Sequence, residues 1–226
     1  MAGDNLTGAN MYAYCNGNPV MCCDPSGMAS EWIQGMRDIF ALLQSIATSL
    51  GRVGEWIALT AVIFAEASSS ENTRGGYFDE YDKYIIWRVD QLAVASIIMN
   101  RRNDTTGEYK NQNTFWAVIS ASGQFTTFDD VNDSINTALR GESASALSRL
   151  VNAGVIAFQM QAGAFDPLEE LKGYTQFRGR NSFEARFTPY VDSSGDAGIF
   201  DSNRGPKAVM NVIDFGGNYY FMWADS

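Results

Sequence analysis

Glu66 is the residue of this chain whose setting best suits acid–base chemistry. It follows an apolar run, residues 56–65, and a polar loop comes after it. A carboxyl group held against apolar neighbours is a candidate general acid, because desolvation disfavours its charged form. If the run is a helix, Glu66 lies near the C-terminus, where the dipole also opposes a negative charge. The alternative is a solvated residue at a helix end, and the run alone favours that alternative.

The absence of histidine from all 226 residues removes several classes of enzyme. Ser-His-Asp and Cys-His hydrolases, histidine-dependent nucleases and His-ligated zinc enzymes all need an imidazole. The three cysteines, Cys15, Cys22 and Cys23, lack the paired spacing of a metal site. We therefore expect chemistry based on carboxylates, hydroxyls or arginines, with no metal and no cofactor.

The formal net charge of −10 bears on partners and location. Nucleic-acid binding relies on basic patches, so we expect no nucleic acid partner. No apolar stretch is long enough to span a bilayer, so we expect no membrane insertion. The first residues have neither the basic nor the apolar region of a signal peptide. An acidic surface suits a basic partner protein.

Hydrophobic periodicity predicts a mainly helical domain. Residues 68–84 read as a loop, and residues 165–205 as irregular. The segments 209–215 and 218–223, joined by Gly216 and Gly217, predict a β-hairpin. The expected fold class is α+β, mainly α, with a small C-terminal β-hairpin. Residues 114–120 are a short apolar piece before a turn, and the predicted helical segments are 30–50, 53–67, 89–101, 129–139 and 144–161.

The first 28 residues differ in kind from the rest, being rich in Gly, Asn, Asp and Pro. The stretch 10–28 resembles the end of the Rhs (YD-repeat) core, in which an N-x-Y-x-Y-x-x-N-x-P-V segment precedes a P-x-x-x-x-D-P-x-G-L signature. Met28 stands where that family has leucine. The matching residues are Pro19, Asp24, Pro25 and Gly27.

This resemblance implies a toxin carried by a large β-shell. In that family the motif marks where the shell ends and self-cleavage frees a variable C-terminal toxin. Asp24 would be the acid of that cleavage, and the scissile bond would follow Met28. Residues 1–28 are then the end of the Rhs core and residues 29–226 the toxin. Its implied partners are the Rhs shell and a cognate immunity protein. A dedicated machine such as type VI secretion would export it without a signal peptide.

Four segments, in order, resemble the cell-wall hydrolase family of spore-cortex-lytic enzymes. The loop after Glu66 is longer than is usual in that family, and Tyr219 replaces a histidine of its closing strand. The family's F-Y-N-P segment has no clear counterpart, and residues 174–179 come nearest to it. The four segments are Phe64-Ala65-Glu66-Ala67, the stretch from Leu92 to Asn100-Arg101, Gly123-Gln124-Phe125-Thr126, and the stretch from Gly217 to Phe221.

The second resemblance implies a lysozyme-like fold that acts on peptidoglycan glycan strands in the periplasm of target cells. Related enzymes are lytic transglycosylases with one catalytic glutamate, which here would be Glu66. Asn100 and Arg101 are expected to be a helix C-cap and a structural ion pair. The candidate substrate contacts are Gln124, Phe125, Thr126, Tyr174 and Tyr219.

Other functions stay open on the sequence alone. A muramidase would cleave the same bond by hydrolysis and needs a second carboxylate, for which Glu71, Asp79, Glu80 and Asp82 are available. An ADP-ribosyltransferase toxin using NAD is a further alternative, since Phe177-Arg178-Gly179 faintly resembles its arginine motif. Its expected E-x-E is missing, and Asp214 is a lone late carboxylate. A noncatalytic binding or pore-forming toxin, with the helix at 30–50 in the membrane, is less favoured because that helix has few basic residues.

Overall fold

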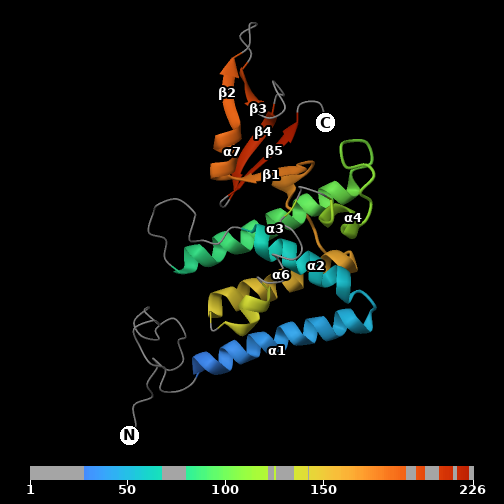
Figure 1. The fold of residues 1–226 in the computed structure, drawn as a ribbon, viewed down its shortest axis with the longest axis vertical. Helices are drawn as coiled ribbons and strands as arrows, with labels where there is room; N and C mark the ends of the chain where they lie inside the picture. Colours follow the sequence, from blue (N-terminus) through green and yellow to red (C-terminus); the bar gives the residue numbers. More distant parts are fainter. Residues whose placement is uncertain are drawn as a thin grey trace.

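The helices form stacked layers, and the strands gather on one side of them. A computed structural model describes residues 28–67, 80–121, 125, 135–141, 143–191, 197–201, 209–215 and 218–223. Figure 1 shows α1 at the foot of the molecule, α6 and α2 above it, then α3, with the strands at the top. The helices are α1 (Met28–Ser49), α2 (Val53–Glu66), α3 (Glu80–Asn103), α4 (Phe115–Ile119), α6 (Ala144–Ala162) and α7 (Arg180–Arg186), with a 3-10 turn η4 (Glu169–Leu171); residues 135–140 are also helical.

Helix α2 is the centre of the helical layers. It packs against α1, α3, α4 and α6, which explains why nearly every residue of the run 56–64 is buried. Trp56, Leu59 and Ile63 are completely excluded from solvent. A helix that is apolar on all sides needs such an enclosure. The direction of α2 is therefore set by its neighbours along its whole length.

The indole of Trp56 fits against a glycine of α6. Its Nε1 donates a hydrogen bond of 2.9 Å to the Gly154 carbonyl oxygen. A Cβ atom added at Gly154 would lie 3.0 Å from the Trp56 ring, 3.5 Å from Leu43 and 3.8 Å from Phe40. Glycine lets α6 approach α2 and α1 closely, which offsets the low helix propensity of this residue.

The strands form a three-stranded antiparallel sheet and a separate pair. In the larger sheet β5 (Asn218–Trp223) lies between β1 (Gln176–Gly179) and β4 (Val209–Phe215). The pair consists of β2 (Phe187–Val191) and β3 (Ala197–Asp201). Neighbouring residues of a strand point to opposite faces. Tyr220 accordingly packs on Ala93 and Ile97 of α3, whereas Phe221 packs on Phe183 and Phe187.

The α+β class, the predominance of helix and the C-terminal hairpin are confirmed. The prediction was wrong about the start of α3, which lies at Glu80 rather than residue 89 and continues past Arg101 to Asn103. Residues 80–84 were predicted to belong to the loop 68–84, yet acidic residues such as Glu80 and Asp82 suit the positive N-terminal end of a helix. The irregular prediction for 165–205 was also wrong. It contains η4, β1, α7, β2 and β3, elements too short for a periodic signal.

The predicted Rhs motif falls almost wholly outside the described residues. Pro19, Asp24, Pro25 and Gly27 lie there, and Met28 is the first residue of α1. The predicted domain boundary after Met28 therefore comes one residue into α1. Within the part of the chain that the structure describes, no helix is long and apolar enough to cross a membrane.

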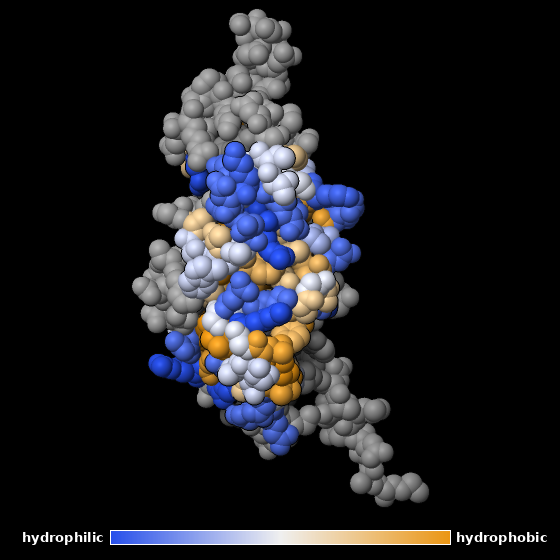
Figure 2. Space-filling view, turned by 90° about the vertical axis from the view of Figure 1, so that its right-hand side faces the viewer, coloured by the Kyte–Doolittle hydropathy of each residue, from blue (hydrophilic) through white to orange (hydrophobic). Residues whose placement is uncertain are grey.

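Helix α1 is only partly covered. Phe40 and Ala47 face the core, but large apolar side chains on its other side are exposed. Figure 2 shows apolar residues gathered at the level of this helix. The exposed large apolar residues at this helix are Ile39, Leu42 and Ile46 of α1, and Leu50 directly after it.

We predict that Gly154→Ala destabilises the protein by about 1 to 2 kcal/mol, because the new methyl group presses on the fixed Trp56 indole. Gly35→Ala is the matched control. Gly35 is also helical, but nothing lies within 4 Å of its added Cβ, so it should gain stability, by about 0.5 to 1 kcal/mol. Urea denaturation of both variants measures this contrast. Stabilisation by both would show that the α2–α6 contact adapts to the extra carbon.

Candidate active site

Glu66 is the last residue of α2 and is partly buried. The helix has no basic residue of its own in its last turn. Arg149 of α6 supplies one: its Nη2 donates to the carbonyl oxygens of Phe64, at 3.4 Å, and Ala67, at 3.1 Å. Its guanidinium also lies 5.2 Å from the centre of the Phe64 ring. A cation at this end satisfies terminal carbonyls and suits the helix dipole, so the backbone that carries Glu66 is fixed on both sides.

Arg101 of α3 is a buried cation held by aromatic rings. The residue is only 3% exposed. Its guanidinium carbon lies 4.8 Å from the ring centre of Tyr109, 5.0 Å from that of Phe125 and 5.9 Å from that of Phe177. We call these three rings the aromatic box. The Arg101 Nε donates a 2.7 Å hydrogen bond to the Thr175 carbonyl oxygen. Cation–π contacts and a buried hydrogen bond offset part of the cost of burying this charge.

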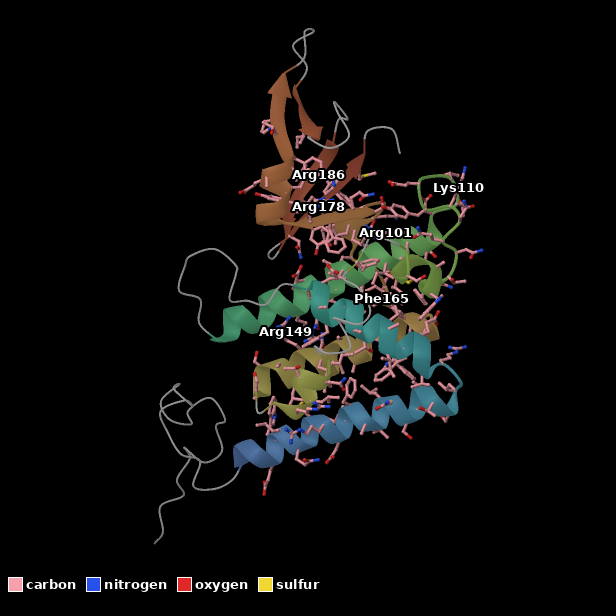
Figure 3. All side chains as sticks on the ribbon, in the orientation of Figure 1. Arg101, Lys110, Arg149, Phe165, Arg178 and Arg186 are labelled. Carbon is pink, nitrogen blue, oxygen red and sulfur yellow. The ribbon has the colours of Figure 1, made fainter. Side chains whose placement is uncertain are left out.

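A tight loop after α3 places Tyr109 in the aromatic box. The Asp104 carboxylate accepts hydrogen bonds from the backbone N–H groups of Thr106, Gly107 and Tyr109. Burial acts to raise the pKa of Asp104, but these hydrogen bonds and the charge of Lys110 outweigh it and lower the pKa. The Tyr109 hydroxyl also accepts a hydrogen bond from Gln176 Nε2 on β1. The ring is thus fixed from both ends. Figure 3 labels Arg101 on α3 and Lys110, the residue after Tyr109, in the loop that follows this helix.

A second buried polar group joins the sheet to α3. The Asp90 carboxylate is fully buried and accepts a 2.9 Å hydrogen bond from the Tyr220 hydroxyl. It also accepts from Asn218 Nδ2, at 3.2 Å and 3.4 Å. The Tyr220 ring stacks on Phe177, with centroids 5.9 Å apart. Since Phe177 also belongs to the aromatic box, the surroundings of Arg101 and of Asp90 share one side chain.

Glu66 interacts electrostatically with both Arg101 and Tyr220. Burial lowers the pKa of Arg101, while interactions with Tyr109, Glu108 and Glu66 act in the opposite direction. Burial and then Asp90 raise the pKa of Tyr220 well above its ordinary value, and Glu66 adds to that rise. Helix α2 packs against α3, and β5 packs on α3 through Tyr220. We take Glu66, Arg101 and Tyr220, with the aromatic box, as the candidate active site.

Among the predicted substrate contacts, Phe125 belongs to this site. Its ring lies over Arg101 and 6.1 Å from that of Phe177. Gln124 and Thr126 lie outside the described residues. Tyr174 is 8% exposed, packs with Ala93 and Tyr220, and has a pKa raised by burial.

Tyr219 lies on the other face of β5 from Tyr220. Its hydroxyl donates to Glu184 Oε1 at 3.3 Å, and its ring is 4.7 Å from that of Phe183. The Tyr219 side chain thus contacts Glu184 and Phe183 of α7, whereas that of Tyr220 packs on α3. Asn100 is not a helix C-cap, because α3 continues beyond it. Its Nδ2 donates to the carbonyl oxygens of Leu171 and Tyr174, at 2.7 Å and 2.8 Å, and so ties α3 to the segment before β1.

The two buried charges of α3 could have been recognised from one sequence signal, although Asp90 was not predicted and Arg101 was expected only to form a structural ion pair. Asp90 and Arg101 are separated by Val94 and Ile97, and the spacings of four, three and four residues put all of them on one face of α3. Val94 and Ile97 are fully buried. Charged residues on an apolar helix stripe are rare without partners.

Comparison of the chain with protein-family models, with curated proteins and with solved structures found no match. Across the described residues, no group of three or more Cys, Asp or Glu side chains could hold a metal ion.

We predict that Tyr220→Phe lowers the free energy of unfolding by about 1 to 3 kcal/mol, because the buried Asp90 carboxylate loses a donor. Tyr219→Phe is the matched control on the same strand. Its hydroxyl bonds an exposed carboxylate, so we expect a loss below about 0.5 kcal/mol. Urea denaturation at neutral pH gives both values. Equal losses would contradict the role assigned to the Asp90 hydrogen bond.

Proposed function

We propose that this protein is an antibacterial effector toxin that cleaves the MurNAc–GlcNAc backbone of peptidoglycan, as a lytic transglycosylase with Glu66 as its acid and base. The observation that carries the proposal is the setting of Glu66. It is a partly buried carboxyl group on a fixed helix end, and it interacts electrostatically with the buried cation Arg101, which aromatic rings surround. Aromatic rings suit the apolar faces of sugars, and a fixed carboxylate suits proton transfer.

The chemistry needs one carboxyl group that moves a proton twice. Glu66 first donates its proton to the glycosidic oxygen, and the bond from that oxygen to MurNAc C1 breaks. The ionised Glu66 then takes the proton of the MurNAc C6 hydroxyl, and O6 bonds to C1. A 1,6-anhydro ring forms, no water is consumed, and Glu66 regains its starting state.

A second carboxylate would favour hydrolysis, the muramidase alternative. Glu71 and Asp79 lie outside the described residues, and Glu80 and Asp82 are in the first turn of α3. Asp90 is the buried carboxylate of this region, but it is fully excluded from solvent and bonded to Tyr220 and Asn218. Asp90 therefore does not suit the activation of water.

The proposal for the whole protein follows the Rhs resemblance. Residues 29–226 would be the toxin, released from an Rhs shell, exported by a dedicated machine such as type VI secretion, and active in the periplasm of target cells. A cognate immunity protein would protect the producing cell. The net charge of −10 suits a basic partner.

The ADP-ribosyltransferase alternative finds one point of support in the sheet. Arg178 of β1 and Asp214 of β4 both pair with Tyr219 of β5. Arg178 and Asp214 thus lie at the same register position, on the two strands that flank Tyr219. The ADP-ribosyltransferase alternative assigns no role to Glu66, so a substitution of Glu66 distinguishes the two functions experimentally.

We predict that Glu66→Gln lowers the rate of glycan cleavage by about 10²- to 10⁴-fold, because glutamine cannot donate and retrieve a proton. The assay is the release of muropeptides from purified sacculi, followed by mass spectrometry. Glu55→Gln, at the opposite end of α2, is the matched control and should keep its activity.

In cells, a periplasmic signal fused to the wild-type protein should cause lysis, and the Glu66→Gln form should not. Cleavage by Glu66→Gln at the wild-type rate would sink the assignment of Glu66. Toxicity in the cytoplasm that requires Arg178 and consumes NAD would favour the transferase.

We predict that the products end in 1,6-anhydroMurNAc and contain no oxygen from water, because O6 of the sugar is the nucleophile. Digestion in ¹⁸O-labelled water tests this, since hydrolysis places the label at the new reducing end. Labelled ends would make the enzyme a muramidase. Single Gln or Asn substitutions at Glu71, Asp79, Glu80 and Asp82 would then identify the second carboxylate.

A further inference from the structure

One face of α1 is apolar, exposed and uncharged. Ile39, Leu42, Ile46 and Leu50 follow one another at spacings of three, four and four residues, which sets them along one side of the helix. We call these four residues the α1 stripe. Leu42 is 60% exposed and Leu50 is 55% exposed, and no charged residue occurs from 39 to 51. Single exposed apolar residues are common, but a continuous stripe of them marks a surface that another molecule covers.

Polar side chains beside the α1 stripe are hydrogen-bonded within α1 itself. Ser49, three residues after Ile46, donates from Oγ to the Ile46 carbonyl oxygen at 2.8 Å. Asp38, four residues before Leu42, accepts a 2.8 Å hydrogen bond from Gln34 Nε2. Burial of a polar group is costly when the group loses its partner, and these groups keep theirs. The α1 stripe can therefore be covered without leaving these two side chains unsatisfied.

The charges at the two ends of the α1 stripe indicate what covers it. Asp38 directly precedes the stripe, and Arg52 follows it at the start of α2. Arg52 is exposed, and its Nη1 donates a 2.9 Å hydrogen bond to the Gln161 carbonyl oxygen. A second α1 lying antiparallel to the first would bring opposite charges together at both ends. The stripe is thus complementary to a second copy of itself.

The positions along the helix agree with a single symmetry axis. In the antiparallel arrangement Leu42 meets Ile46 of the second copy, Ile39 meets Leu50, and Asp38 comes beside Arg52. The midpoints of these three pairs all fall between residues 44 and 45. One two-fold axis therefore serves every pair, as an isologous contact between identical chains requires.

We propose that the α1 stripe binds a second copy of this chain, with the two α1 helices antiparallel about a two-fold axis near residues 44 and 45. The net charge of −10 opposes self-association, so two copies meet best at an uncharged face. A single pair of helices makes an interface at the small end of the known range, so we expect a dissociation constant on the order of 10 to 100 μM. This inference does not depend on the proposed function.

Analytical ultracentrifugation of the full chain measures the association. A reducing agent is included so that disulfides through Cys15, Cys22 or Cys23 do not contribute. We expect a reversible monomer–dimer equilibrium that added sodium chloride strengthens, because salt screens the repulsion between two chains of the same charge. A monomer at every concentration up to about 1 mM, or an open series of larger oligomers, would overturn the proposal.

Leu42→Glu tests the stripe itself. Symmetry places the new carboxylate in the interface twice, so the dissociation constant should rise by at least about 100-fold. Gln44→Glu is the matched control, since it adds the same charge at an exposed position of the same helix. Gln44 lies two residues from both Leu42 and Ile46, on nearly the opposite side of the helix, so we expect a change below about threefold. Dimerisation of Leu42→Glu as tight as that of Gln44→Glu would contradict the proposal.

A charge swap tests the antiparallel direction. Asp38→Arg brings like charges together at each end and should weaken the dimer about 3- to 10-fold, although it makes the chain less negative. The double variant Asp38→Arg/Arg52→Asp restores opposite charges, keeps the net charge and should return the dissociation constant to within about twofold of the wild-type value. A dimer that Asp38→Arg does not weaken would overturn the antiparallel pairing.

Photo-cross-linking from position 42 identifies the occupant directly. We expect a product of twice the chain's mass, joined to residue 46 of the second copy. Cross-links to residues 1–27 of the same copy would assign the stripe to that segment and overturn the proposal. Binding of a monomer to uncharged phosphatidylcholine vesicles, abolished by Leu42→Glu, would overturn it in favour of a lipid surface.

Discussion

Helix α2 is enclosed by α1, α3, α4 and α6, and this enclosure decides where Glu66 lies. Trp56 is locked near one end of α2 by its contact with Gly154, and Arg149 bonds the backbone at the other. A helix fixed at both ends presents its final residue in one position. Side chains built on such rigid elements keep a catalytic geometry better than those on loops. The packing that encloses α2 therefore also fixes where the backbone of Glu66 lies.

The two buried charged residues of α3, Asp90 and Arg101, join this helix to different parts of the structure. Asp90 binds the sheet through Tyr220 and Asn218, while Arg101 is held by rings from the loop, from Phe125 and from β1. Breaking a buried polar contact costs more than its net contribution to folding, because a partner remains desolvated. The sheet and the helices are therefore held in a specific arrangement, in which the Phe177 ring lies against both the Arg101 guanidinium and the Tyr220 ring.

Long periodic segments could be predicted from the sequence, and long-range pairings could not. The boundaries of the hairpin at Gly216 and Gly217 were correct because turn residues stand between two apolar alternations. The strand β1 has only four residues and is specified by its partner β5, more than thirty residues later, so no local pattern reveals it. For the site, the apolar run pointed to Glu66, but the aromatic box around Arg101 is built from separate parts of the chain. The sheet face of Tyr219 follows from alternation once β5 is known, yet which tyrosine meets α3 depends on register.

The order of strands also constrains when the fold can form. Among the described elements β5 is the last in the chain, but it is the middle strand of its sheet. Neither β1 nor β4 finds a partner within this sheet until β5 arrives, and contacts between distant segments form slowly. During synthesis the helical layers can assemble first. The hydrogen bonds that Tyr220 and Asn218 donate to Asp90 form only after β5 has been added. A chain truncated before β5 consequently lacks the strand that pairs with both β1 and β4, and the Asp90 carboxylate loses its two donors, Tyr220 and Asn218.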